Sequence, residues 1–359
     1  MDGSRDTWVG KVAYFDIPGR YMLNQRVGVL RPKRNVEIDV RCCAYFLSSD
    51  AFQDFFIAVA TSSGGQANLS PSQILAEKIS LPPLEEQTKI ASLLTAFDER
   101  IALLRETSAT LEAIAQALFK SWFVDFDPVR AKMEGRVPEG MDEATASLFP
   151  DSFEETELGE VPRGWRLSNV GESFVLIMGQ SPPGDTYNDV NDGLPFYQGR
   201  TDFGFRFPTQ RIFCNAPTRI AEIGDTLVSV RAPVGDVNMA IEKCCIGRGV
   251  ASVRHPDGHR GFTFYALRGL GERFKTFDSE GTVFGSINKK DFQALPIVDP
   301  GPKLLEAFEE ISHPIDQRIV ENEEQLRALV ALRDNLLPRL ISGQLRLPDA
   351  QPELETASA

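Results

Sequence analysis

The sequence predicts an α+β fold in which two mixed α/β domains alternate with two long coiled-coil helices. Two segments of about forty residues carry apolar side chains at heptad spacing, and a segment of short apolar runs precedes each of them. The two halves also repeat each other at an offset of about 218 residues. With 359 residues, 42% of them hydrophobic, the chain is long enough for two or three domains with separate cores.

Residues 1–81 are predicted to be a shortened first copy of the repeated globular unit. The second copy begins near residue 162, about 65 residues before Arg231, whereas the matching position in the first copy is Arg5. We therefore expect residues 1–81 to be less stable than residues 161–300 as isolated domains. The aligned pairs include Arg5 with Arg231, Tyr45 with Tyr265, Asp98 with Asp316, Leu111 with Leu329, and Leu118 with Leu336.

Residues 82–124 predict the first long helix. Residues 84–123 contain no Gly or Pro, and one apolar stripe continues for more than four heptads, which is typical of a coiled coil. The core of an ordinary helix bundle is the alternative explanation of this stripe. Its members are Ile90, Leu94, Phe97, Ile101, Leu104, Leu111, Ala115, Leu118 and Trp122, with Ser108 as the polar exception.

Residues 125–160 predict an acidic linker, since they hold 11 acidic and 3 basic residues. The globular segments are nearly neutral, with 9 basic and 8 acidic residues in 1–81, and 16 and 15 in 161–300. The formal net charge of −13 therefore comes from the linker, the helices and the C-terminal tail. An acidic total does not exclude a polyanionic partner when the charge is distributed in this way.

Residues 161–300 predict the complete copy of the globular domain. Short apolar runs bounded by Gly and Pro indicate the strands of a twisted sheet, and one amphipathic helix fits Phe262–Lys275. The predicted strands are Phe174–Met178, Asp225–Val230, Asn238–Ile241 and Val250–Val253.

Residues 301–345 predict the second long helix, which repeats the apolar stripe of the first. Pro302 suits a first helical turn, whereas Pro314 should kink the helix or delay its start. Gly343 indicates the end of the helix, and residues 346–359 predict a disordered tail.

Other features argue against a membrane protein, a metalloprotein or an enzyme. No apolar run approaches the ~20 residues of a membrane span, and no signal sequence begins the chain, so we expect a cytoplasmic protein. No Cys-x-x-Cys spacing occurs, and His255 and His259 flank a Pro-Asp-Gly turn rather than sharing a helix face, so no metal ion is expected. Phosphate-binding, dinucleotide-binding and nucleophile-elbow motifs are absent, which favours a binding or scaffold role without a cofactor.

The turns of both globular copies contain residues that can bind nucleic acid. Gln and Asn can bond adenine, Arg and Lys can bond guanine, and Ser and backbone amides can hold phosphates. A single loop of this composition is more typical of an ordinary solvated surface, but its recurrence in both copies favours DNA binding. The candidates are Gln180, Ser181, Gln198, Arg200, Arg231, Arg248, Ser286, Asn288, Lys289 and Lys290, together with Arg5, Lys11, Gln66 and Asn68.

The whole layout resembles the specificity (S) subunit of type I restriction–modification enzymes. The resemblance rests on LPPLEEQ at residues 81–87, which opens a long helix, and on PRGW at 162–165, which begins the second copy. GDTLVS at 224–229 and the closing helix at 336–345 also match. The resemblance extends over nearly the whole chain, and its departure is the shortened first copy.

The resemblance implies that each globular copy is a target recognition domain for one half of a bipartite, asymmetric DNA site. It also implies that the two helices pack antiparallel as a spacer between the readers. The subunit would be non-catalytic and would bind double-stranded DNA, DNA methyltransferase (modification) subunits and a restriction (helicase-nuclease) subunit. The alternative is a truncated scaffold that keeps its protein partners through the coiled coil but no longer reads DNA.

Overall fold

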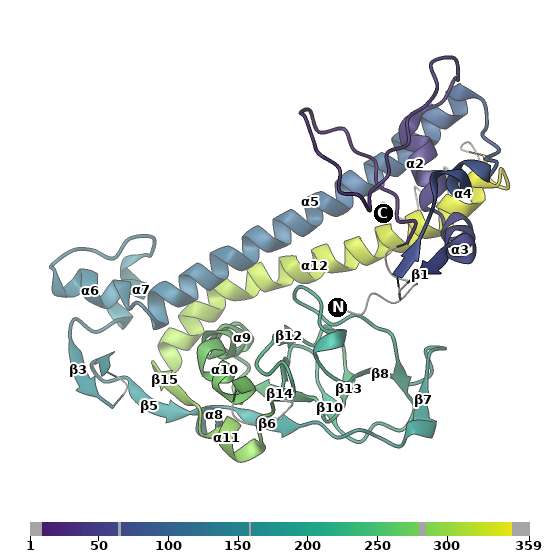
Figure 1. The fold of residues 1–359 in the computed structure, drawn as a ribbon. Helices are drawn as coiled ribbons and strands as arrows, with labels where there is room; N and C mark the ends of the chain where they lie inside the picture. Colours follow the sequence, from purple (N-terminus) through teal and green to yellow (C-terminus); the bar gives the residue numbers. More distant parts are fainter. Residues whose placement is uncertain (1–8, 64–65, 158, 280–284, 347–359) are drawn as a thin grey trace. The chain divides into compact units, whose positions relative to one another are not determined.

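The computed structural model describes residues 9–63, 66–157, 159–279 and 285–346, and it divides into two units (Figure 1). The first unit comprises Met1–Thr107 and Asn322–Ala359, and the second comprises Ser108–Glu321. Each of the two long helices contributes to both units. The mixed α/β composition and the long helix expected from the sequence are confirmed.

The long helices are α5 (Leu84–Phe123) and α12 (Pro302–Ile341), each of 40 residues. Helix α12 begins at Pro302 and continues through Pro314, so the expectation that Pro314 could delay its start was wrong. The Pro314 side chain is exposed, and burial of the apolar stripe on either side of it stabilises a continuous helix.

The two helices pack against each other within each unit and run in opposite directions. In the first unit, Ile90 and Leu94 of α5 share a core with Leu336 and Leu340 of α12. In the second unit, the ring centroid of Phe119 lies 5.8 Å from that of Phe308. The N-terminal part of α5 therefore packs on the C-terminal part of α12, and the reverse holds at the other ends.

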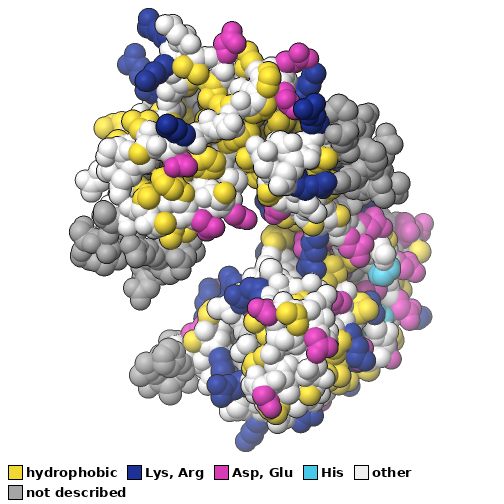
Figure 2. Space-filling view, turned by 90° about the vertical axis from the view of Figure 1, so that its right-hand side faces the viewer, with side chains coloured by type: hydrophobic (Ala, Val, Ile, Leu, Met, Phe, Trp, Pro, Cys, Tyr) yellow, Lys and Arg dark blue, Asp and Glu magenta, His cyan; other side chains and the backbone are white. Residues whose placement is uncertain are grey.

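The globular part of the first unit consists of short helices and one small hairpin. Residues 9–39 form neither helix nor strand and expose many apolar side chains, among them Phe15 and Met22. Yellow apolar patches are visible on the upper part of Figure 2. The elements are α2 (Val40–Ser48), α3 (Asp50–Val59), β1 (Thr61–Ser63), β2 (Gln66–Asn68) and α4 (Pro71–Ala76).

The second unit contains a four-stranded sheet of order β12-β11-β14-β6 and a five-stranded sheet of order β10-β13-β8-β9-β7. The first sheet consists of β6 (Val175–Met178), β11 (Thr226–Ser229), β12 (Val237–Met239) and β14 (Val250–Arg254). The second consists of β7 (Tyr187–Asn188), β8 (Leu194–Tyr197), β9 (Phe213–Cys214), β10 (Ile220–Ala221) and β13 (Cys244–Ile246). The four-stranded sheet thus contains a strand at each of the four runs that the sequence indicated.

Smaller elements complete the second unit. The acidic stretch 125–160 folds into two short helices and a hairpin, and its Val129 and Phe149 join the core. These and the remaining strands are α6 (Asp127–Met133), α7 (Glu143–Leu148), β3 (Phe153–Thr156), β4 (Gly159–Pro162), β5 (Arg166–Asn169) and β15 (Pro296–Asp299). The other helices are α8 (Val170–Ser173), η1 (Gly184–Thr186), η2 (Arg200–Asp202), α9 (Arg260–Gly269), α10 (Gly271–Ser279) and α11 (Lys289–Gln293).

One aromatic core joins the sheet and the long helices of the second unit. Phe262 of α9 lies between Phe119 and Phe123 of α5, with centroid distances of 5.7 and 5.3 Å. The single helix expected over Phe262–Lys275 was wrong in its length, since α9 ends at Gly269 and α10 follows. Burying such large rings removes much apolar surface from water, which fastens the globular part to both helices.

Candidate nucleic-acid interface

Four loops of the second unit come together at one edge of its sheets. β14 is antiparallel to both β11 and β6, so β6 and β11 end on the side where β14 begins. β8 is parallel to β13, and both end in the same region. We call this region the loop edge and define it as residues 179–181, 198–200, 230–232 and 247–249.

Backbone hydrogen bonds hold the loop edge together. The amide of Gln180 donates to Ile246 O at 3.0 Å, that of Val230 to Gly249 O at 3.0 Å, and that of Gly247 to Tyr197 O at 2.8 Å. A Cβ at Gly249 would lie 2.2 Å from Gln198 O, so only glycine permits this approach. The loops therefore form one connected surface.

The loop edge brings together six of the candidate residues. Gln180, Gln198, Arg231 and Arg248 are exposed there, and Ser181 Oγ accepts the Arg248 amide at 3.4 Å. Among the described residues, neither Arg231 nor Arg248 has a carboxylate within ion-pair distance. In Figure 2, Lys and Arg side chains are visible on the lower part, which is the second unit, together with Asp and Glu side chains and uncharged surface. Such a surface can donate to phosphates and base edges.

Arg200 is also exposed at the loop edge, but it forms an ion pair with Asp236. A carboxylate partner offsets the charge of a guanidinium and so weakens its attraction for a phosphate. Arg200 is therefore a weaker candidate than Arg231 or Arg248.

A second stretch of candidates adjoins Arg231. Ser286 forms a β-bridge with Arg231, and the Ala232 amide donates to Gly285 O at 2.9 Å. Lys289 and Lys290 follow, exposed in the first turn of α11.

Asn288 has a local structural role in this stretch. Its Oδ1 accepts the amide of Asp291 at 3.0 Å, and its Nδ2 donates to the Asp291 carboxylate at 2.6 Å. Asn288 thus caps helix α11, an arrangement that satisfies an otherwise unpaired amide of the first turn.

The candidates of the first unit are only partly described. Lys11 is exposed in the segment without helix or strand, and Asn68 is exposed at the end of β2. Gln66 belongs to β2, but its side chain lies outside the described residues, as does the whole of Arg5.

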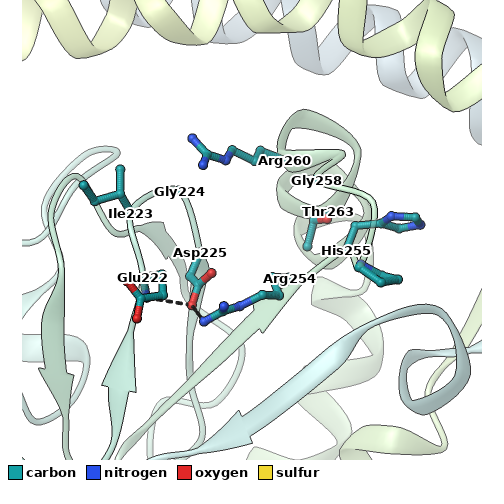
Figure 3. Close-up of a pocket in the computed structure, with 10 residues that line it drawn as sticks. Glu222, Ile223, Gly224, Asp225, Arg254, His255, Gly258, Arg260 and Thr263 are labelled. Carbon is teal, nitrogen blue, oxygen red and sulfur yellow. Dashed lines mark hydrogen bonds and ion pairs between the residues drawn. The ribbon is translucent and has the colours of Figure 1, made fainter.

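A cavity of about 210 Å³ lies at the opposite end of β11 from the loop edge (Figure 3). Its central carboxylate, Asp225, is buried and accepts three hydrogen bonds. These come from the amide of Glu222 at 2.9 Å, from Ser252 Oγ at 2.5 Å and from Arg254 Nη2 at 2.7 Å. Asp225 thus fixes the turn into β11 and the end of β14, which is a structural role for the Gly-Asp pair.

Two histidines beside this cavity lie closer together than the sequence indicated. The potential ligand atoms of His255, Asp257 and His259 lie within 4.8 Å of one another, so the turn brings these side chains together although they do not share a helix face. The Nδ1 of His255 already accepts the amide of Asp257 at 3.2 Å. Burial, and secondly the neighbouring His259, lower the pKa of His255.

A buried cluster of charges in the second unit was missed from the sequence. Arg206, Glu112 and Asp316 form ion pairs in which the Arg206 side chain is only 1% exposed. The available signal was an arginine between two phenylalanines, at Phe205 and Phe207. An arginine in such a context is rarely buried unless it is paired.

Comparisons with known proteins agree on one family. A family model described as the type I restriction modification DNA specificity domain matches residues 4–113. The chain is 30% identical over 345 residues to the "Putative type I restriction enzyme MjaX specificity subunit" of Methanocaldococcus jannaschii, covering 94% of this chain and 76% of that protein. It is 25% identical over 374 residues to the type I restriction enzyme HindI specificity subunit of Haemophilus influenzae, covering 90% and 81% respectively.

A solved structure supports the fold. The S subunit of a type I restriction–modification system from M. genitalium matches with a TM-score of 0.52 at 18% identity, covering 85% of this chain and 73% of that one. Among the described helices, none combines the length and the apolar character that crossing a membrane requires.

Proposed function

Because this chain belongs to the family of type I restriction enzyme specificity subunits, we propose that it is the DNA-sequence-reading, non-catalytic subunit of such an enzyme. The observation that carries this proposal is the loop edge of the second unit. Four loops there present exposed Gln and Arg side chains, two of them arginines without a carboxylate partner among the described residues. These are the groups that read base edges and hold phosphates.

The finer assignment follows the family layout. Residues 1–81 and 161–300 act as two target recognition domains, each reading one half of a bipartite, asymmetric site in double-stranded DNA. Residues 82–124 and 301–345 form the antiparallel coiled-coil spacer, with 125–160 as the acidic linker and 346–359 as a tail. The subunit works in the cytoplasm, where it scaffolds DNA methyltransferase subunits and, for cleavage, a restriction subunit.

A second function is favoured by one observation in the first unit. Residues 9–39 form no regular element and leave apolar side chains exposed, in contrast to the buried, paired strands of the second unit. On that basis the chain would be a scaffold that binds its protein partners through the long helices without selecting a DNA sequence. Sequence-selective methylation by the complex separates the two functions.

The test uses the complex of this chain with its modification subunits. Arg231→Gln and Arg248→Gln should each weaken binding to DNA and reduce the slope of log affinity against log salt by about 1 per lost phosphate contact. If the replaced arginine reads a guanine, its loss should instead relax the sequence requirement at that base. Arg163→Gln is the matched control, because Arg163 is exposed in the same unit but lies outside the loop edge.

Unchanged affinity, salt slope and methylated sequence in both variants would contradict the assignment of the loop edge. Sequence-independent binding by the unaltered complex would favour the scaffold instead. The purified chain alone should show neither methyl transfer nor cleavage.

A further inference from the structure

The buried Arg206 connects the globular part of the second unit to both long helices. It lies in the loop between η2 and β9, and its Nη1 is 3.2 Å from Glu112 Oε2 of α5. Its Nη2 is 2.6 Å from Asp316 Oδ1 of α12. The guanidinium carbon also lies 3.5 Å from the ring centroid of Phe264 in α9. One side chain thus contacts three helices.

The charges around Arg206 are balanced. Arg268 of α9 also pairs with Glu112, so two arginines face two carboxylates. The hydroxyl of Tyr265 lies 3.3 Å from Arg206 Nη1 and adds a third polar contact. Buried ion pairs of this kind depend strongly on geometry, because their attraction must offset the cost of removing both charges from water.

The loop that carries Arg206 is fastened to the sheet that ends at the loop edge. Arg206 O accepts the amide of Met239 at 2.9 Å, and Gly204 O accepts Asn238 Nδ2 at 3.1 Å. Both partners belong to β12, which pairs with β11, and β11 leads directly into Arg231. A short chain of hydrogen bonds therefore runs from the ion cluster to the candidate DNA-binding arginine.

The internal repeat provides a comparison within the same chain. Tyr45 and Asp98 are the repeat counterparts of Tyr265 and Asp316, and in the first unit the Tyr45 hydroxyl donates to Asp98 Oδ2 at 2.6 Å. The arginine on Asp98 is Arg333 of α12, whose Nη1 lies 2.7 Å from Asp98 Oδ1. The aspartate is therefore repeated, but its arginine comes from a long helix in one unit and from the globular part in the other.

We propose that Arg206 is a positioning residue that holds the loop edge in one orientation on the segments of α5 and α12 belonging to the second unit. The inference rests on the proposed function, because orientation matters only if the loop edge reads DNA. Arg333 of α12 pairs with Asp98 of α5, and this pair is linked to the globular part of the first unit through the hydrogen bond from Tyr45 to Asp98. Arg333 is thus a natural control for the loss of a partly buried arginine.

The first experiment measures orientation in the full chain. Spin labels at Ala216→Cys and Glu310→Cys, both exposed in the second unit, report the distance between the sheet region and α12. A Cys43→Ser background removes the partly accessible native thiol. We expect one narrow distance distribution in the reference protein, a broadened or shifted one in Arg206→Met, and no change in Arg333→Met.

The second experiment measures methylation by the complex with modification subunits, using the same variants without labels. A misplacement of about 1 Å can cost on the order of 100-fold in rate, so Arg206→Met should lose methylation on that scale. Arg206→Lys keeps the charge but lacks the planar fork that spans two carboxylates, so it should give only partial recovery.

A triple variant separates positioning from stability. Arg206→Met combined with Glu112→Met and Asp316→Met leaves none of these three charges buried, and apolar replacement of an ion cluster commonly preserves folding. Arg268 loses its partner in this variant, but its side chain is 33% exposed and can be solvated. We expect a urea midpoint near the reference value together with a broadened distance distribution and low methylation.

Three results would overturn the inference. They are a triple variant with the reference distance and methylation, an Arg206→Met protein with both unchanged, or an Arg333→Met protein as broadened as Arg206→Met. Failure of the unaltered complex to select a DNA sequence would refute the proposed function, whereas the distance measurement would still decide the role of Arg206.

Discussion

At the scale of single residues, the second unit contains both exposed arginines at the loop edge and buried charges that are paired. Arg231 and Arg248 are open to solvent, whereas Arg206 and Asp225 are enclosed and bound to several partners. An exposed arginine can exchange water for phosphate at little cost. A buried arginine cannot leave its partners without a loss of stability, because breaking the ion pair leaves an uncompensated charge in the interior.

His255 should make folding depend on pH. Burial first, and His259 second, lower its pKa below the ordinary value of 6.5, so the unfolded chain binds this proton more readily than the folded protein. The contribution of His255 to stability is therefore full above pH 6.5 and is lost as pH falls from 6.5 towards the lowered folded pKa. Each tenfold difference in proton affinity is worth about 1.4 kcal/mol.

Urea unfolding at about pH 7.5 and about pH 5.5 checks this expectation. His255→Gln should lose less stability between the two values than the unaltered protein. His313→Gln, a change at an exposed position on α12, should retain the full loss. Equal loss in all three proteins would contradict the assignment.

At the scale of elements, α12 shows how tertiary burial overrides a local signal. An internal proline removes one hydrogen bond of the helix and crowds the preceding turn, yet α12 continues through Pro314. Its buried residues, such as Phe308 and Ile319, pack on either side of that proline. Burial of this stripe outweighs the cost of the proline.

Replacing that proline should therefore stabilise the protein. We expect Pro314→Ala to raise the free energy of unfolding by about 1–3 kcal/mol, because the missing hydrogen bond is restored. Pro302→Ala should give no such gain, since the first turn of a helix has no partner for that amide. Urea midpoints of the two variants test this prediction. An equal change in both would contradict the stabilising effect expected at Pro314.

At the scale of the whole molecule, the two units differ in how much regular structure their globular parts contain. Residues 9–39 form no helix or strand, whereas β11 and β14 are buried and paired on both sides. The protection of backbone amides follows such differences, because exchange requires local opening.

Hydrogen exchange of the full chain should reveal this difference. We expect amides in residues 9–39 to exchange more than about a hundredfold faster than those of β11 and β14. The hairpin β3–β4 serves as an internal reference for a short, partly exposed sheet and should lie between the two. Similar protection of residues 9–39 and β11 would show that the first globular part is as stable as the second.

Several features could be predicted from the sequence because they are encoded by local periodicity. The apolar stripe at every third or fourth residue predicted long helices, and α5 and α12 bury that stripe. Short apolar runs between glycines and prolines lie where β6, β11, β12 and β14 form. The break between α9 and α10 at Leu270 was not predicted, although Gly269 and Gly271 flank it and glycine disfavours a helix interior.

The candidate site was predicted as a set of loops, but its composition was decided by the tertiary structure. Residue type alone did not distinguish Arg248, which is exposed, from Arg200, which pairs with Asp236, or from Asn288, which caps a helix.

By itself, the sequence predicted the alternation of globular parts and long helices and contained the internal repeat, and it lacks phosphate-binding, dinucleotide-binding and nucleophile-elbow motifs. Only the tertiary structure decided which charges are buried and which loops meet. Arg206 lies 94 residues from Glu112 and 110 from Asp316, and no periodic pattern connects them. Periodicity reports which face of a segment is buried, whereas a contact between distant residues depends on how whole elements pack.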